Sequence, residues 1–340
     1  MSIVAFNWAL YIEKQTQAIL DRMATFSWPF YIEIWGHFLV DHHAARVLPW
    51  YIADSKAQIF NKLSKYTDLN VLFCINAKDI VRDRQFSQKY ISFEKYILQE
   101  LISCESTLNI KPQIVVTMLD HDFIPPHIRE CEDKLKSLWY TIYHKYLINN
   151  YPTNTDLILS NNGYGKDDHI PTHTWITLVS ACGSNSGKLW TCLSQLYLDH
   201  QKNIQSNYAK YETFPIRNLS LDHPINLAYE AATADIEDYN MIDPYYTEQK
   251  AINYNRDVKA FEILRKFWEI MKIDVPSSPT LMGINTAGFC LSDDEKSKKE
   301  ISDACREEIE YRIKLYTKLL LSGHGEEEAV TRCEALLQKL

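Results

Sequence analysis

A short loop of small residues, placed between an apolar run and a helical pattern, constrains this chain most. Residues Ile176 to Val179 are apolar or β-branched, and apolar side chains recur at helical spacing after Lys188. The stretch therefore predicts a strand, a loop and a helix. Backbone N–H groups in such a loop converge on an anion, while the helix N-terminus and a lysine add positive charge. The predicted phosphate-binding residues are Gly183, Ser184, Ser186, Gly187 and Lys188.

This loop resembles a P-loop but departs from its pattern at two points. Three residues rather than four separate Gly183 from Gly187, and Leu189 follows Lys188 where a P-loop has Ser or Thr. The hydroxyl that holds magnesium in a P-loop is therefore missing, unless Thr191 or Ser186 supplies it. A tight turn with a surface lysine is the alternative interpretation.

The composition is that of a globular protein and excludes some partners. The chain has 340 residues, enough for a large core and typically for two domains. Its net charge of −8 argues against a general binder of nucleic acid or membrane surfaces, which needs a basic field. The eight cysteines stand singly, which predicts reduced, mostly buried thiols. With no basic leader and no long apolar run, we expect a cytoplasmic protein.

Short apolar runs alternate with helical patterns along the first part of the chain. This alternation predicts βαβ units and an α/β fold with a largely parallel, doubly wound sheet, followed by a mainly helical C-terminal part. We expect an α/β domain over residues 1–220 and a helical domain over 221–340. The predicted strands are Val71–Ile75, Ile114–Leu119, Leu157–Leu159 and the Ile176 run, with a hairpin over Phe30–Leu39 and helices over Trp8–Met23, Ser55–Ser64 and Glu130–Leu147.

A second glycine–lysine loop follows the predicted strand Leu157–Leu159. It contains Gly163, Gly165 and Lys166, with Asp168 close behind. Because loops at the carboxyl ends of neighbouring parallel strands lie close together, both loops are expected to hold one anionic ligand. A simple turn of the Asn-Gly type is the alternative.

Polar residues cluster just after the predicted hairpin. Asp41, His43 and Arg46 lie within six residues, where a histidine can move protons and an arginine can clamp a phosphate. The alternative is a polar strand end that caps the next element. Adjacent histidines lack the i, i+4 spacing of a helical metal site, so we do not predict one here.

Further candidate acids lie later in the chain. The predicted strand Tyr208–Pro215 places Lys210 and Glu212 on one face, and Asp243 lies in an acidic, aromatic segment without periodicity. We predict that Asp41, His43, Asp168, Glu212 and Asp243 do acid–base work, and that Arg46, Lys166, Lys188 and Thr191 contact a phosphate-bearing cofactor.

Several long motifs lie along the chain, among them Asn162–Asp168, Gly183–Gln195, Ala209–Ile216, His223–Asp235, Asn253–Asp257 and Ser278–Gly288. Together these motifs closely resemble the bacterial domain-of-unknown-function family 1846. The resemblance covers most of the chain to about residue 295, and it implies no particular reaction. Members of the family are usually longer, with a further C-terminal domain, and they have more Gly and Pro in the loop before Lys188.

Three classes of function fit these residues. The first is an enzyme that uses ATP or another phosphate-bearing ligand, with Mg²⁺ as a candidate cofactor, for phosphoryl transfer or ligation on a small metabolite. The second is a regulator that binds a nucleotide or phosphometabolite without turnover. The third is a protein-interaction module built on exposed aromatic residues. We expect a small phosphorylated partner, no nucleic acid and no membrane, and a homo-oligomer is compatible with the sequence.

Overall fold

A parallel seven-stranded sheet forms the centre of the protein. The computed structural model describes residues 5–26, 28–84, 91–183, 185–246, 250–272, 276–323 and 325–340. All pairs in this sheet are parallel, in the order β4-β3-β2-β5-β1-β6-β9, and β7 and β8 form a separate antiparallel pair. The strands are β1 (Phe30–Ile34), β2 (Leu69–Asn76), β3 (Gln113–Leu119), β4 (Ile142–Tyr146), β5 (Ile176–Ala181), β6 (Asn207–Tyr211), β7 (Asn240–Ile242), β8 (Ile252–Tyr254) and β9 (Gly283–Ile284).

Helices connect these strands and cover the sheet. Three short 3₁₀ turns, η1 (Tyr164–Lys166), η2 (Ala234–Ile236) and η3 (Ala287–Phe289), lie between them. The α-helices are α1 (Trp8–Ala24), α2 (His42–Val47), α3 (Ser55–Leu63), α4 (Ala77–Val81), α5 (Phe93–Leu108), α6 (Pro126–Ser137), α7 (Thr155–Ile158), α8 (Lys188–Gln201), α9 (Pro224–Ala232), α10 (Asn255–Met271), α11 (Pro279–Met282), α12 (Glu295–Leu321) and α13 (Glu327–Leu337).

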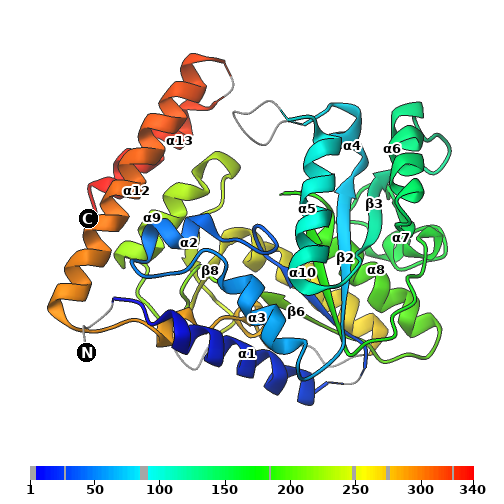
Figure 1. Cartoon of the computed structure of the whole chain (residues 1–340), viewed down its shortest axis with the longest axis horizontal. Helices are drawn as coiled ribbons and strands as arrows, with labels where there is room; N and C mark the ends of the chain where they lie inside the picture. Colours follow the sequence, from blue (N-terminus) through cyan, green and yellow to red (C-terminus); the bar gives the residue numbers. More distant parts are fainter. Residues whose placement is uncertain are drawn as a thin grey trace.

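The two faces of the sheet bury different helices, as the alternation of side chains along a strand requires. In β1, Phe30 and Ile32 pack in the core with α1 and α3, whereas Tyr31 packs with α8 and α10. Likewise, Phe73 of β2 packs with α5 and α6, and Leu72 packs with α8. The predicted parallel, doubly wound α/β sheet is therefore confirmed (Figure 1).

Three local predictions are wrong. The Phe30–Leu39 run is one parallel strand followed by a loop, because β1 pairs with β5 and β6 and not with the residues after Gly36. The predicted strand Leu157–Leu159 is the helical turn α7. The predicted helix Glu130–Leu147 ends at Ser137, where Trp139 takes a positive φ of 65° and turns the chain into β4.

The C-terminal third is mainly helical, and it is attached to the sheet. The long helix α12 packs against α9 and α13 at one side of the molecule (Figure 1). Ile309 of α12 and Cys333 of α13 belong to the same buried cluster as Phe30 and Ile176 of the sheet. Residues beyond 220 also supply β9 and α10 to the sheet layers. The predicted boundary at residue 220 stays a prediction.

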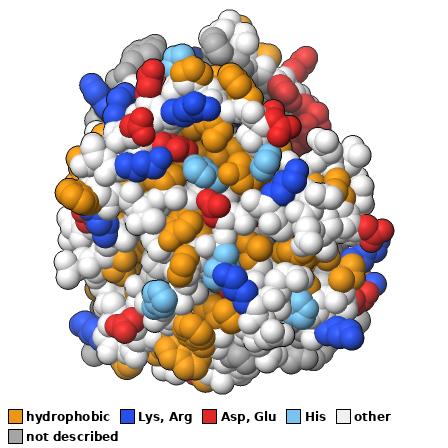
Figure 2. Space-filling view, turned by 90° about the vertical axis from the view of Figure 1, so that its right-hand side faces the viewer, with side chains coloured by type: hydrophobic (Ala, Val, Ile, Leu, Met, Phe, Trp, Pro, Cys, Tyr) orange, Lys and Arg blue, Asp and Glu red, His pale blue; other side chains and the backbone are white. Residues whose placement is uncertain are grey.

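The surface carries both signs of charge. Figure 2 looks onto the side where α6 and α7 lie in Figure 1 and shows lysine and arginine interspersed with acids, histidines and apolar groups. Among the helices of the described residues, none has the length and apolar character needed to cross a membrane. All eight cysteines are buried and unpaired, as predicted.

Candidate functional site

The polar residues of interest gather at the carboxyl edge of the sheet, between β5 and β1. These strands are neighbours, but the chain leaves β1 toward β2 through α3 and leaves β5 toward β6 through α8, on the opposite face. Adjacent strands whose connections diverge in this way leave a crevice, and open α/β sheets bind ligands there. The loops after β1 and β5 therefore border the candidate site.

The loop after β5 is held by side chains from the neighbouring strand ends. Asn76 at the end of β2 donates its amide to the Asn185 carbonyl (2.9 Å), and the Thr117 hydroxyl of β3 donates to the Ser186 carbonyl (2.9 Å). The Ser186 hydroxyl donates to the Gly183 carbonyl (2.9 Å). Ser184, predicted to bind phosphate, lies outside the described residues. The loop is thus fixed through its carbonyl groups.

The N–H groups of this loop remain open, by contrast. Within the described residues, the N–H groups of Ser186, Gly187 and Lys188 have no hydrogen-bond acceptor. The first N–H groups of any helix lack intrahelical partners, and they attract anions. Gly187 is required at the helix start, because its φ is +79° and a Cβ there would lie 3.0 Å from the Thr117 side chain. The loop therefore presents fixed, unpaired donors.

Lys188 is a half-buried cation that lacks a counter-ion. Among the described residues its ammonium has no hydrogen bond and no ion pair, unlike the other lysines of the site. Its removal from water lowers its pKa, and Lys56 and Lys210 lower it further, whereas Glu33 and Cys74 oppose this effect. An anion beside Lys188 would stabilise the charged form of this lysine, which burial and the two neighbouring lysines disfavour.

The loop after β1 is organised by a buried lysine. Lys56 of α3 is 1% exposed, and its ammonium donates to the carbonyls of Trp35 (2.7 Å) and His37 (3.0 Å). It also lies 3.3 Å from a carboxylate oxygen of Asp41. Asp41 caps α2 by accepting from the Ala44 N–H (3.1 Å). Asp41, a predicted acid, thus lies at this edge of the sheet, where Ala44, Lys56 and Thr213 contact its carboxylate.

Strand β6 and the residue after it place a lysine and an acid on one face, as predicted, and this face is the α8 side of the sheet. The Lys210 ammonium lies 2.9 Å from a Glu212 oxygen and also pairs with Asp257 of α10. Glu212 needs the glycine opposite it, because a Cβ on Gly283 would lie 2.6 Å from the Glu212 carboxylate. Glu33 of β1 accepts a hydrogen bond from Tyr208 (2.7 Å) on the same face.

Other predicted residues bond elsewhere. The Thr191 side chain is buried, and its hydroxyl pairs with Cys74 Sγ at 3.3 Å. The Arg46 guanidinium bonds Glu308 of α12 at 2.7 Å. His43 belongs to α2. The roles of these three residues stay predictions.

The second glycine–lysine loop is built differently from the first. The N–H groups of Gly163 and Gly165 both donate to the Ser160 carbonyl at 3.0 Å, so they are not open to a ligand. Lys166 is exposed, and no hydrogen bond or ion pair in the described chain joins it to the loop after β5. The premise that this loop follows a strand is wrong, because α7 precedes it.

Two further predicted acids have structural partners. Asp168 lies against the edge strand β4, where its carboxylate accepts from the His144 N–H (2.8 Å) and its own N–H donates to the His144 carbonyl (3.0 Å). Asp243 is buried and accepts from the N–H groups of Thr280 (3.0 Å) and Tyr245 (2.8 Å). The structure joins neither acid to Lys188 by a contact.

A hollow of about 440 Å³ adjoins the loop after β5. Asn185 from the tip of that loop lines it, together with Asp235, Ile236, Glu237, Arg256 and Glu326. Arg256 is the second residue of α10, and its guanidinium donates two hydrogen bonds to Asp238 (2.6 and 2.8 Å). The hollow has space for a small ligand, and of the loop after β5 it is Asn185 that lines it. Within the described residues, no group of His, Cys, Asp or Glu is arranged to hold a metal ion.

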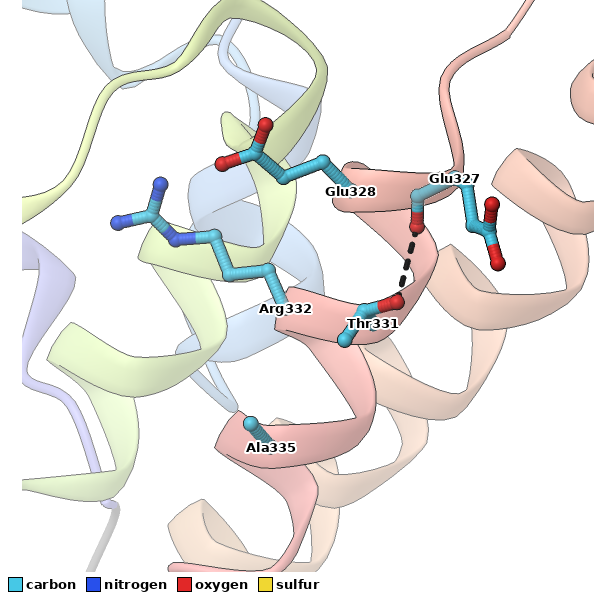
Figure 3. Close-up of a pocket in the computed structure, with 5 residues that line it drawn as sticks. All are labelled: Glu327, Glu328, Thr331, Arg332 and Ala335. Carbon is cyan, nitrogen blue, oxygen red and sulfur yellow. Dashed lines mark hydrogen bonds between the residues drawn. The ribbon is translucent and has the colours of Figure 1, made fainter.

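A second hollow lies away from the sheet edge, on α13. It has about 510 Å³ and contains none of the predicted residues. Figure 3 shows Arg332 extending toward α9, where it pairs with Glu230 at 3.0 Å, while Thr331 bonds the Glu327 carbonyl on the other side. Arg332 and Thr331 thus already have protein partners. The carboxyl edge of the sheet, where donors remain open, is therefore the better candidate site.

Sequence reasoning missed Lys56, Glu33 and Asp257. In the sequence pattern, Lys56 looks like an ordinary surface lysine of an amphipathic helix, and Glu33 lies inside an apolar run. The one available signal was Glu33 itself, since a charged residue within a buried strand needs a partner or a function. Asp257 gave no comparable signal, because it meets Lys210 only through the fold.

The fold and the site together define an α/β protein with a parallel sheet and a polar crevice at its carboxyl edge. The chain belongs to the family described as "Domain of unknown function DUF1846, N-terminal", whose pattern matches residues 4–340. It is 38% identical to a UPF0371 protein of Streptococcus equi subsp. equi, over 100% of this chain and 68% of the relative. A UPF0371 protein of Corynebacterium efficiens is 37% identical, over 95% of this chain and 64% of the relative. The chain thus spans about two thirds of the length of these relatives.

Proposed function

We propose that the protein binds a small phosphate-bearing molecule, such as a nucleotide or a phosphorylated metabolite, at the loop after β5. The observation that carries this proposal is Lys188, whose half-buried ammonium lies at the start of a fourteen-residue helix and has no counter-ion among the described residues. The open N–H groups of Ser186, Gly187 and Lys188 lie beside it. A phosphate supplies both the missing charge and several acceptors.

The construction of the loop supports binding of an anion rather than a simple turn. Side chains of Asn76 and Thr117 hold two loop carbonyls, so the donors are oriented before a ligand arrives. Donors that are already oriented lose less entropy on binding. The loop after α7, whose glycine N–H groups bond Ser160, shows what a glycine–lysine turn looks like when its donors are used internally.

An enzyme of phosphoryl transfer or ligation is the form of this function that we favour. A regulator that binds without turnover would use the same phosphate-binding loop. Acids near this loop favour the enzyme over the regulator. Glu212, Asp257 and Glu33 lie on the same side of the sheet as Lys188, where proton transfer and charge stabilisation are needed. Mg²⁺ stays a candidate that the ligand itself would bring.

Thermal unfolding with and without ligand tests this proposal. Inorganic phosphate and ATP, the latter with and without Mg²⁺, are expected to raise the melting temperature of the wild type. Lys188→Ala removes the cation and should abolish the rise without destabilising the ligand-free protein, since Lys188 has no partner to lose. Lys65→Ala, at an exposed position, is the matched control and should keep the rise.

Two outcomes contradict the proposal. One is the absence of any rise with phosphate compounds, and the other is an equal rise in Lys188→Ala. Lys166→Ala tests whether both glycine–lysine loops bind the phosphate. The affinity for phosphate falls in this variant only if the loop after α7 contributes to binding.

A further inference from the structure

The hollow of about 440 Å³ shares a residue with the proposed phosphate-binding loop. Asn185 lines the hollow and directly precedes Ser186, whose N–H has no acceptor within the described chain. The peptide between the two residues is trans, and Asn76 donates to its carbonyl (2.9 Å), so its N–H points the opposite way. A ligand held at this loop therefore has the hollow next to it for the rest of its structure.

Three carboxylates give the hollow open acceptors. Asp235 lies in η2, Glu237 follows it, and Glu326 directly precedes α13. All three are exposed, and none of them forms an ion pair within the part of the chain that the structure describes. Asp235 accepts one hydrogen bond, from the Tyr316 hydroxyl (3.1 Å). Because a carboxylate accepts several hydrogen bonds, most of this acceptor capacity remains free.

Arg256 gives the same hollow oriented donors. Its Nε and one terminal nitrogen donate to the two oxygens of Asp238 (2.8 and 2.6 Å). The Asp238 side chain is 5% exposed, whereas that of Arg256 is 47% exposed. A guanidinium is planar and has more N–H groups than this pair uses. The buried acid thus holds the arginine in place while its other N–H groups remain available.

This mixture of donors and acceptors distinguishes between classes of ligand. A metal ion or an ammonium group would use acceptors alone, and a second phosphate would use donors alone. The hydroxyl groups of a sugar use both, because each hydroxyl donates one hydrogen bond and accepts others. The exposed side chain of Ile236 adds an apolar surface for the C–H groups of a sugar ring. The volume of the hollow is within the range of small-molecule sites.

We propose that the hollow binds the sugar of a phosphorylated sugar or a nucleotide whose phosphate lies at the loop after β5. Sugar hydroxyls donate to Asp235 and Glu237 and accept from Arg256. This inference rests on the proposed function, and it identifies the ligand by the hydroxyl groups next to its phosphate. It concerns binding alone, so it applies equally to an enzyme and to a regulator.

Calorimetry with a series of phosphate esters tests the inference. Methyl phosphate has no hydroxyl group outside its phosphate, whereas ribose 5-phosphate and glucose 6-phosphate have several. We expect the better of the two sugar phosphates to bind at least about tenfold more tightly than methyl phosphate, as hydrogen bonds to charged groups imply. AMP distinguishes the two sources of the sugar. Tighter binding of AMP than of ribose 5-phosphate identifies a nucleotide, and weaker binding identifies a free sugar phosphate.

The double variant Asp235→Asn/Glu237→Ala tests whether the hollow causes this preference. Its asparagine keeps an oxygen for the Tyr316 hydroxyl, and no hydrogen bond or ion pair joins the Glu237 side chain to the described residues, so we expect it to fold. The preference for the sugar phosphate should fall about tenfold, while the affinity for methyl phosphate stays unchanged. Asp303→Asn/Glu310→Ala, which changes two exposed acids of α12 outside the hollow, is the matched control and should keep the preference.

Two results would overturn the inference and leave phosphate binding intact. One is equal binding of methyl phosphate and both sugar phosphates by the wild type, and the other is an unchanged preference in Asp235→Asn/Glu237→Ala. Failure of every ester to bind contradicts the proposed function itself.

Discussion

Single residues at the carboxyl edge of the sheet carry charge where burial disfavours it. Lys56 is enclosed but bonds two carbonyls and Asp41, so its charge is compensated within the fold. Lys188 lacks such compensation in the described structure, and Glu212 shares its one lysine with Asp257. Groups with this kind of imbalance occur most often at functional sites.

The raised pKa of Glu212 predicts how the stability of the fold changes with pH. Its pKa rises from 4.5 to about 7 on folding, so the folded protein binds this proton more tightly. The stabilisation is complete below pH 4.5 and is lost as pH rises through 7, a change of roughly 3 kcal/mol at most. Glu212→Gln does not titrate and should escape this loss. Urea unfolding of both proteins at pH 5 and pH 8 measures it; a constant difference between them contradicts the prediction.

The distinctive elements of the site are the two loops at the strand ends, and the loop after β5 is the more constrained. Gly187 has a φ of +79°, and Thr117 leaves no space for a Cβ there. Gly323, after α12, has a similar φ of +75° but no atom within 4 Å of the added Cβ. The two glycines therefore differ in crowding and not in backbone conformation.

Alanine substitutions at Gly187 and Gly323 separate the effect of crowding from the effect of the positive φ. Gly323→Ala should cost about 1 kcal/mol, the penalty for a side chain at positive φ. Gly187→Ala should cost more, because Thr117 must move, and it should also reduce the effect of phosphate on the melting temperature. Chemical denaturation measures the loss of stability, and thermal unfolding with and without phosphate measures the effect of the ligand. If both variants behave alike, the contact with Thr117 has no influence on the loop.

The sequence predicts the elements whose patterns are long or distinctive. The strand, loop and helix around Lys188 are confirmed, as are α1, α3 and the parallel character of the sheet. The strand β4 is missed because its sequence, Ile-Tyr-His-Lys-Tyr, continues the helical spacing of α6, and only the turn at Trp139 separates them. The contact of Lys210 with Asp257 joins residues far apart in sequence, and no local pattern encodes it.

At the scale of the whole molecule, the sheet and the C-terminal helices share one core. Ile309 in the middle of α12 is fully buried in the cluster that contains Phe30 and Ile176 of adjacent strands. Tyr316 of the same helix donates a hydrogen bond to the Ala231 carbonyl of α9 (3.2 Å). This continuity indicates that the α/β part and the helical part stabilise each other.

Ile309→Ala therefore tests whether the chain unfolds as one unit or as two domains divided near residue 220. Removing a fully buried isoleucine should lower the free energy of unfolding by about 2–5 kcal/mol. In a shared core the loss affects the entire molecule, so far-UV circular dichroism and tryptophan fluorescence should report a single transition at a lower urea concentration. Ile313→Ala, one turn further along α12 and only partly buried, should have a smaller effect. Two separate transitions, with only one of them moved by Ile309→Ala, would instead support independent domains.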